Sequence, residues 1–184
     1  MNRKLMGAMT ALTLLAGSSL AALAVENPMV GGAPMYDSKN IIENALNSKD
    51  HTTLVTAVKA AGLVETLQGP GPFTVFAPTN AAFAALPAGT VETLVKPENK
   101  DTLTGILTYH VVPGKLDSKA LDAAIKAGNG KAMLKTVNGE ELTFEGTGMK
   151  LMLTDSKGHK AHVTVADVYQ SNGVIQVIDT VLMP

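Results

Sequence analysis

The chain contains no cysteine and no tryptophan, and its one arginine, Arg3, stands at the very start. Without cysteine the protein forms no disulfide bonds and has no thiol for catalysis, redox chemistry or metal binding. Arginine is the usual side chain for gripping phosphate groups and base edges. Its near absence, with a net charge of −1, argues against nucleic-acid binding. The hydrophobic core alone must therefore hold the fold together.

The first 24 residues have the parts of a secretion signal. Arg3 and Lys4 give a positive start, and an apolar stretch runs from there to an Ala-Leu-Ala sequence ending at Ala24, the pattern that signal peptidase cuts. The alternative is an uncleaved membrane anchor, because the stretch is nearly long enough to span a bilayer. Interrupting polar residues favour cleavage, and Ser18 stands where a lipoprotein would need its lipid-bearing cysteine. We expect a signal peptide at 1–24 and export, to the periplasm or the cell surface and extracellular space, without a stable membrane anchor.

Cleavage after residue 24 leaves 160 residues, with 13 basic side chains against 16 acidic ones and a net charge of −3. A domain of this size buries roughly 70% of its unfolded surface, enough for a stable core without disulfides. Residues 25–37 are rich in Pro and Gly and lack periodicity, so they are predicted to be a flexible lead-in. No second linker or internal repeat follows. One domain is therefore expected at 38–184.

The first half of this domain has helical patterns. Asp37 or Ser38 is predicted to cap a helix whose apolar residues begin at Ile41. Gly62 is predicted to end the next helix. A short strand at 73–76 precedes Thr79, which stands where a helix N-cap would. Further helices are expected after Pro97 and after Asp117 or Ser118, the latter ended by Gly128.

The second half has strand patterns instead. Strands are expected on either side of Asn138-Gly139, on either side of the turn at 155–158, and after Asn172-Gly173, with ranges 131–137, 141–144, 149–154, 160–169 and 174–182. Helices followed by an antiparallel meander indicate an α+β domain with helices packed on part of a sheet or sandwich.

No arrangement of residues points to catalysis or to a cofactor. The sequence lacks a G-x-S-x-G motif and a glycine-rich phosphate loop, and its serines stand at helix starts and turns. His159 and His162 are three apart in a turn and strand, which points their side chains to opposite faces and disfavours a shared metal. We therefore expect no enzyme activity, no cofactor and no metal site.

Two segments stand out, Gly71–Phe83 (GPFTVFAPTNAAF) and Leu107–Gly114 (LTYHVVPG). In the second, a helix gives way to a strand at Tyr109-His110, and a buried imidazole or phenol at such a junction must find hydrogen-bond partners. One interpretation is structural, with His110 binding loop backbone or the region of Thr79 and Asn80 and fixing the junction. The other is direct contact with a ligand.

These segments, together with SNGVIQVIDTVL at 171–182, resemble the fasciclin-like domain in order and spacing. The resemblance covers residue 38 to the end and implies a β-sandwich or wedge with several helices packed around it. It marks Thr79, Asn80, His110, Asn172 and Gly173 as the structural motif residues. It also implies secreted or surface proteins that mediate adhesion and protein binding without catalysis.

In adhesive animal members of that family, a Tyr-His pair and an Asp-Ile pair are implicated in receptor binding. Tyr109 and His110 match the first pair, and Asp167-Val168 matches the second with Val in place of Ile. The resemblance therefore makes Tyr109, His110, Asp167 and Val168 the predicted partner-binding residues.

The leading hypothesis is a secreted, non-enzymatic adhesion or protein-interaction module of the fasciclin type. Its partner would be another protein or a component of the matrix or cell surface. A second hypothesis is a secreted protein that binds a small lipophilic ligand, because methionine lines adaptable apolar pockets and the chain carries several after the leader, namely Met29, Met35, Met133, Met149, Met152 and Met183.

Overall fold

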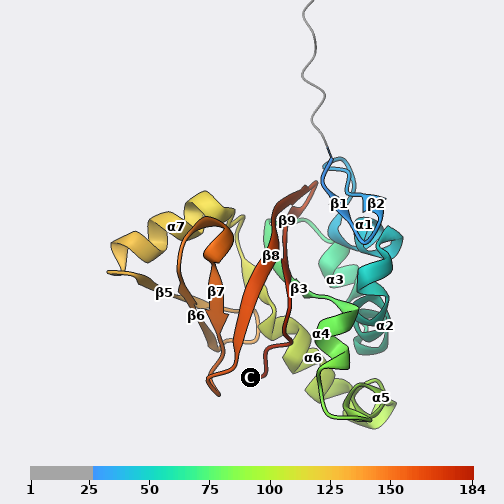
Figure 1. Ribbon diagram of the computed structural model, residues 1–184. Coiled ribbons are helices and arrows are strands. Elements are labelled where there is room, and N and C mark those ends of the chain that lie inside the picture. Colours follow the sequence, from blue (N-terminus) through green and yellow to red (C-terminus); the bar gives the residue numbers. More distant parts are fainter. Residues whose placement is uncertain (1–26) are drawn as a thin grey trace, which may run out of the picture.

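The computed structural model describes residues 27–184, and the predicted signal peptide lies outside them. Helices and strands alternate irregularly along the chain (Figure 1). The α-helices are α1 (Ile41–Asn47), α2 (Thr52–Ala61), α3 (Val64–Gln68), α4 (Asn80–Ala84), α5 (Thr90–Leu94), α6 (Lys100–Tyr109) and α7 (Ser118–Ala127), with 3-10 turns η1 (Lys49–His51), η2 (Pro97–Asn99) and η3 (Gly148–Lys150). The strands are β1 (Met29–Val30), β2 (Ala33–Pro34), β3 (Phe73–Pro78), β4 (Val111–Pro113), β5 (Lys131–Lys135), β6 (Glu141–Glu145), β7 (Met152–Thr154), β8 (Lys160–Gln170) and β9 (Gly173–Ile178).

Seven strands form one sheet in the order β4-β3-β9-β8-β7-β6-β5, and only β3 and β9 are parallel neighbours. The sheet curls until its ends approach each other, where the Val137 N–H donates to the Val111 carbonyl just beyond the end of β5. The predicted α+β class is therefore confirmed, and of the two predicted arrangements the structure is one curled, wedge-like sheet rather than two stacked sheets. Helices α1 to α6 lie beside β3 and β9, and α7 lies over β5 to β7 (Figure 1).

Two hydrophobic cores lie on opposite faces of the central strands. Side chains alternate along a strand, so Val75 and Ala77 of β3 face the core beneath the helices, and Phe76 faces the core inside the curl. Phe76 meets Phe144 of β6 there, with ring centroids 5.3 Å apart. Strand β9 is buried along its whole length. A strand buried on both faces explains the continuous apolar run that predicted it.

Local capping follows the sequence closely. The Thr79 hydroxyl accepts from the Ala82 N–H at the start of α4, and Asp117 caps α7 in the same way. Gly62 ends α2 in the left-handed conformation that glycine favours. The cap of α1 was predicted wrongly, because Asn40, not Asp37 or Ser38, accepts from the N–H three residues ahead.

The predicted lead-in is packed onto the domain over most of its length. Strands β1 and β2 form a small antiparallel hairpin, and Val30 and Met35 are 5% and 2% exposed in the helix-side core. The sequence shows no periodicity here because a hairpin of two-residue strands has no room for one. Prediction of a flexible segment over 29–35 was therefore wrong, since two apolar side chains anchor it.

The far end of the chain also departs from the prediction. Strand β9 ends at Ile178 rather than at residue 182, and the last six residues run without strand pairing. They carry Leu182, which is fully buried, back into the core inside the curl.

Candidate functional site

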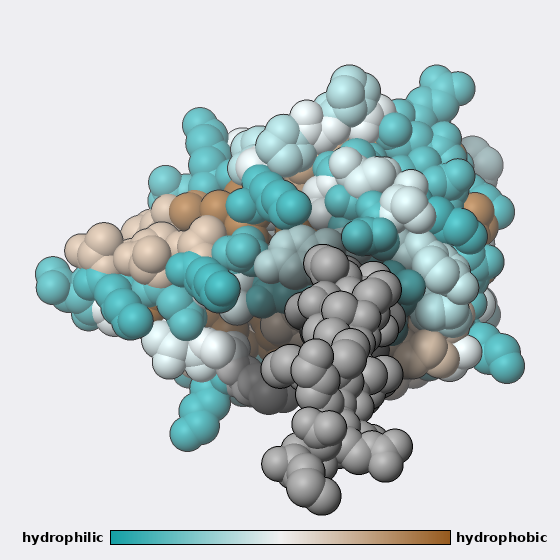
Figure 2. Space-filling view, turned by 90° about the horizontal axis from the view of Figure 1, so that it is seen from above, coloured by the Kyte–Doolittle hydropathy of each residue, from teal (hydrophilic) through white to brown (hydrophobic). Residues whose placement is uncertain are grey.

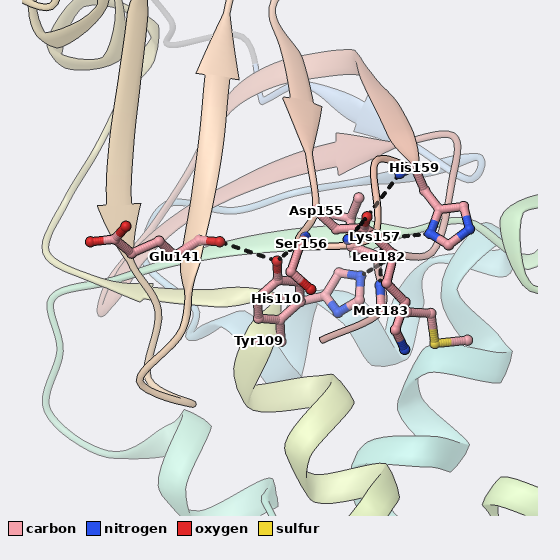
Figure 3. A network of polar contacts seen from close by, with 9 residues as sticks. All are labelled: Tyr109, His110, Glu141, Asp155, Ser156, Lys157, His159, Leu182 and Met183. Atoms are coloured by element: carbon pink, nitrogen blue, oxygen red, sulfur yellow. Dashed lines mark hydrogen bonds and ion pairs between the residues drawn. The ribbon is translucent and has the colours of Figure 1, made fainter.

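The Tyr109-His110 pair stands where α6 meets β4, and both side chains point inward, with exposed fractions of 0% and 2%. The His110 ring bridges two distant parts of the chain (Figure 3). Its Nδ1 lies 2.8 Å from the Ile106 carbonyl, and its Nε2 lies 3.0 Å from the Leu182 N–H. A carbonyl only accepts and an N–H only donates, so Nδ1 carries the proton and Nε2 accepts. The ring is neutral and fixed in one tautomer.

Burial reinforces that neutral state. It lowers the pKa of His110 from 6.5 to about 4, outweighing the opposing effect of the Ile106 carbonyl. A charged imidazole would also present a proton to the Leu182 N–H. The ring is thus a permanent structural link at neutral pH.

Tyr109 has a matching role on the other side of the junction. Its hydroxyl donates to the Glu141 carbonyl at 3.2 Å and accepts from the Ser156 N–H at 3.1 Å (Figure 3). Burial raises the pKa of Tyr109, so the phenol stays protonated. Direct contact of a partner with Tyr109 or His110 would require these side chains to leave the interior.

Asp155 completes this junction, although the sequence shows it only as a turn residue. Its side chain is fully buried and accepts from the N–H groups of Lys157, His159 and Met183 and from the His159 ring, at 2.8–3.0 Å. Burial raises the pKa of a carboxyl, but here the hydrogen bonds from Met183 and His159 outweigh it, and the pKa of Asp155 lies below its usual value. Asp155 and His110 together hold the final residues of the chain in place.

The Asp167-Val168 pair divides between interior and surface. Val168 is completely buried in the helix-side core. Asp167 is half-buried at an irregularity of the β8–β9 pairing and has φ +58°, a left-handed conformation uncommon for a residue with a side chain. Its carboxylate accepts from the Ser118 N–H and hydroxyl and from the Gln176 amide. Asp167 therefore ties the start of α7 to β8 and β9.

The two asparagines of the motif residues cap helices from a distance. The Asn80 side chain accepts from the Thr53 N–H at 3.0 Å and donates to the Lys49 carbonyl at 2.7 Å, closing the start of α2. The Asn172 side chain accepts from the Ile41 N–H at 3.1 Å and donates to the Leu67 carbonyl at 2.7 Å. Each satisfies helix-end groups that lack a partner within their own helix. The His110 ring, by contrast, forms its hydrogen bonds with Ile106 and Leu182 rather than with Thr79 or Asn80.

Gly173 is required by a close approach of two strands. A Cβ added at Gly173 would stand 2.0 Å from the Phe73 carbonyl oxygen of the parallel strand β3. A Gly173→Ala variant is expected to lose about 1–3 kcal/mol of unfolding free energy, because β3 and β9 must separate. Urea unfolding followed by circular dichroism measures this.

The matched control is Gly105→Ala in the middle of α6, where a Cβ would meet nothing within 4 Å. Alanine favours a helix over glycine, so this variant is expected to gain about 0.5–1 kcal/mol. Equal stability of the two variants would contradict the close-approach argument.

A surface hollow of about 580 Å³ opens beside Asp167. Tyr169, 39% exposed, forms part of its wall, and the Lys115 ammonium lies 4.8 Å from the centre of the Tyr169 ring. The Tyr169 hydroxyl lies 3.3 Å from the Asp117 carboxylate. We call this the Tyr169 hollow, and it is lined by Asn27, Pro28, Met35, Asp37, Lys115, Asp167, Tyr169 and Gln170. Sequence reasoning missed Lys115 and Tyr169, since neither belongs to a recognisable motif.

Two further features bear on chemistry. Ser48 and His51 form a buried pair, with Oγ 2.9 Å from Nδ1, and neither is exposed beyond 3%. His159 and His162 pair with different aspartates. Within residues 27–184, no three side chains of the metal-binding types gather closely enough to hold an ion.

Among the helices of residues 27–184, none combines the length and the apolar character that a membrane span needs.

The structure is similar to that of a FAS1 domain pair from the insect cell adhesion molecule Fasciclin I, with a TM-score of 0.55 and 24% sequence identity. The match covers 71% of this chain and 45% of that one, so this chain spans about half of the domain pair. The likeness concerns the fold.

Sequence comparison establishes the family. A model of the Fasciclin domain matches residues 49–184, and the chain therefore belongs to the fasciclin domain family. Protein sll1483 of Synechocystis sp. is 49% identical over 95% of this chain and 98% of its own length. The cell surface glycolipoprotein MPB83 of Mycobacterium bovis is 35% identical over 92% of this chain and 72% of its own length. The resemblance noted in the sequence is confirmed.

Proposed function

We propose that this chain is an exported, non-enzymatic module that binds another protein or a component of the cell surface or matrix. The observation that carries the proposal is the fasciclin family membership, with a relative named as a cell surface glycolipoprotein and a fold neighbour named as a cell adhesion molecule. The polar residues of the family motifs are consistent with this proposal. Their side chains form hydrogen bonds within the domain and hold the fold, so contact with a partner falls to other residues on the surface.

We place the contact surface at the Tyr169 hollow. Interface hot spots are rich in tyrosine, which offers a large rigid contact area. The Tyr169 ring is held by Lys115 and Asp117, so it is ordered before a partner arrives. Figure 2 shows hydrophilic residues over much of one face and a tan-to-brown stretch along its left side. The hollow itself is lined by charged residues as well as Tyr169, which favours a mixed polar and aromatic contact there. In this proposal Tyr109 and His110 act indirectly by fixing the framework.

A binding comparison tests this surface. The mature domain is incubated with washed cells of the organism that exports it, and the retained fraction is measured. Tyr169→Ala is expected to weaken retention about tenfold, as for a hot-spot residue. The control is Met133→Ala, another exposed apolar side chain on the edge strand β5, which is expected to bind like wild type. Retention lost only in Met133→Ala would move the surface to β5, and no retention of the wild-type domain would reject the function.

Export predicts a defined mature N-terminus. Cleavage behind the Ala-Leu-Ala sequence leaves Val25 as the first residue. Intact-mass analysis of the protein from its native host is expected to show the chain from Val25, outside the cytoplasm. A full-length mass in the membrane fraction would instead support the anchor alternative.

A further inference from the structure

The Tyr169 hollow adjoins a second hollow on the same surface. The second hollow has a volume of about 370 Å³, and Lys115 and Gln170 line both. Its remaining walls come from the segments that lead into β3 and β9, namely Pro70, Gly71, Pro72, Ser171, Asn172 and Gly173. The two hollows therefore form one elongated groove, which we call the Lys115 groove. Tyr169 lies in one half of it and Ser171 in the other.

The groove is lined mainly by side chains that form hydrogen bonds. Among those that are exposed, the Lys115 ammonium donates, the Asp37 carboxylate accepts, and the Ser171 hydroxyl does both. Met35 is the one long aliphatic side chain of this lining, and it is 2% exposed, so it adds little open apolar surface. The exposed aromatic surface comes from the Tyr169 ring. The groove thus combines one aromatic ring with donors and acceptors spread along its length.

These features fit a sugar chain better than a peptide. An extended peptide binds at an open strand edge or in pockets for apolar side chains. Strands β8 and β9, which border the groove, each have a neighbouring strand on both sides and so present no free edge. A sugar chain carries hydroxyl groups on its units, and each hydroxyl can both donate and accept. The C–H faces of a sugar ring are apolar and pack against the electron-rich face of an aromatic ring.

We propose that the Lys115 groove binds a polysaccharide, with one sugar unit against the Tyr169 ring and the following units extending past Lys115 to Ser171. The inference rests on the proposed function, because it names the class of surface component that the module binds. Sites for small ligands typically have volumes of about 300–1,000 Å³, and the hollows of about 580 and 370 Å³ both fall in that range. The groove therefore has room for more than one sugar unit.

The wall that would meet the first sugar unit is ordered in advance. The Lys115 ammonium lies 4.8 Å from the centre of the Tyr169 ring, and the Tyr169 hydroxyl lies 3.3 Å from the Asp117 carboxylate. The ring nevertheless remains 39% exposed. Asp167, in the same hollow, is fixed by hydrogen bonds from the N–H and hydroxyl of Ser118. Side chains that are already fixed lose little conformational entropy when a ligand binds, which favours affinity.

The first experiment identifies the class of partner on wild-type protein. Washed cells of the organism that exports the chain are used with and without protease treatment, and polysaccharide extracted from the same cells and freed of protein is the soluble competitor. The mature domain is expected to stay on protease-treated cells, and excess extract is expected to lower its retention about tenfold. Retention that protease abolishes and the extract leaves unchanged would assign a protein partner and overturn this inference, while the proposed function would stand. No retention on untreated cells would reject the proposed function and this inference with it.

Variants then locate the sugar chain in the groove. Native gel electrophoresis through the extracted polysaccharide measures affinity as slower migration. Ser171→Leu fills the second hollow and leaves Tyr169 in place, and it is expected to weaken binding about three- to tenfold. The control, Ala127→Leu, adds bulk at the exposed last residue of α7 and is expected to migrate like wild type. Wild-type affinity in folded Ser171→Leu would overturn the elongated groove, and wild-type affinity in folded Tyr169→Ala would overturn the sugar contact with that ring.

Discussion

Replacing His110 by alanine is expected to lower the free energy of unfolding by about 3–5 kcal/mol. The substitution empties a fully enclosed space and leaves the Ile106 carbonyl and the Leu182 N–H without their side-chain partner. The cost of an unpartnered buried group adds to the cost of the cavity. Urea unfolding at pH 7.5 measures the loss. The hydrogen-exchange rate is expected to increase most, relative to wild type, at the Leu182 amide, because its N–H loses its acceptor.

The control is His162→Ala. Its side chain is 60% exposed and lies 3.4 Å from Asp179, so the expected change is within about 1 kcal/mol. Had His110 been a surface contact residue, the two histidine variants would be equally stable. Similar stabilities would therefore contradict the structural role of His110.

Acid is expected to destabilise the protein before its carboxylates titrate. In the folded state burial lowers the pKa of His110 to about 4, whereas the unfolded chain has the ordinary value of 6.5. The unfolded state therefore binds the extra proton first, and stability falls as the pH drops from 6.5 to 4. The difference between these pKa values corresponds to about 3 kcal/mol. The lowered pKa of His51 acts in the same direction.

Urea midpoints between pH 7.5 and 4 measure this effect. A His110→Gln variant cannot titrate and retains a side-chain acceptor for the Leu182 N–H, so its profile is expected to be flatter over the same range. Gly105→Ala, which involves no titratable group, is expected to keep the wild-type slope. A further loss below the usual carboxyl range is expected from Asp155, whose lowered pKa makes its charged form a source of stability above that range. If the wild-type free energy of unfolding stayed constant from pH 6.5 to 4, His110 would not be buried in solution.

Much of the fold is predictable because its signals are local. The caps at Thr79 and Asp117, the stop at Gly62 and the turn at Asn138-Gly139 each depend on residues within a few positions, and the structure has all four. The hairpin of β1 and β2 escaped prediction because burial of Val30 and Met35 against distant residues anchors it.

The candidate site was less predictable than the fold. Family resemblance drew attention to Tyr109, His110 and Asp167, but a motif does not say which way a side chain points. All three are engaged within the protein. The distant partners that give Tyr109 and His110 this role are Glu141, Ser156 and Leu182, which lie 32, 47 and 72 residues further along the chain. Tyr169 and Lys115 meet for the same reason, across 54 residues.

By itself, the sequence determined the absence of disulfides, the α+β class and the family, because composition, short-range periodicity and motif order are written in consecutive residues. Only the tertiary structure decided that His110 is a neutral interior link and that Tyr169 and Lys115 meet at a surface hollow. Whether a polar atom is satisfied, and whether a side chain meets solvent, depends on groups brought together by folding from distant parts of the chain.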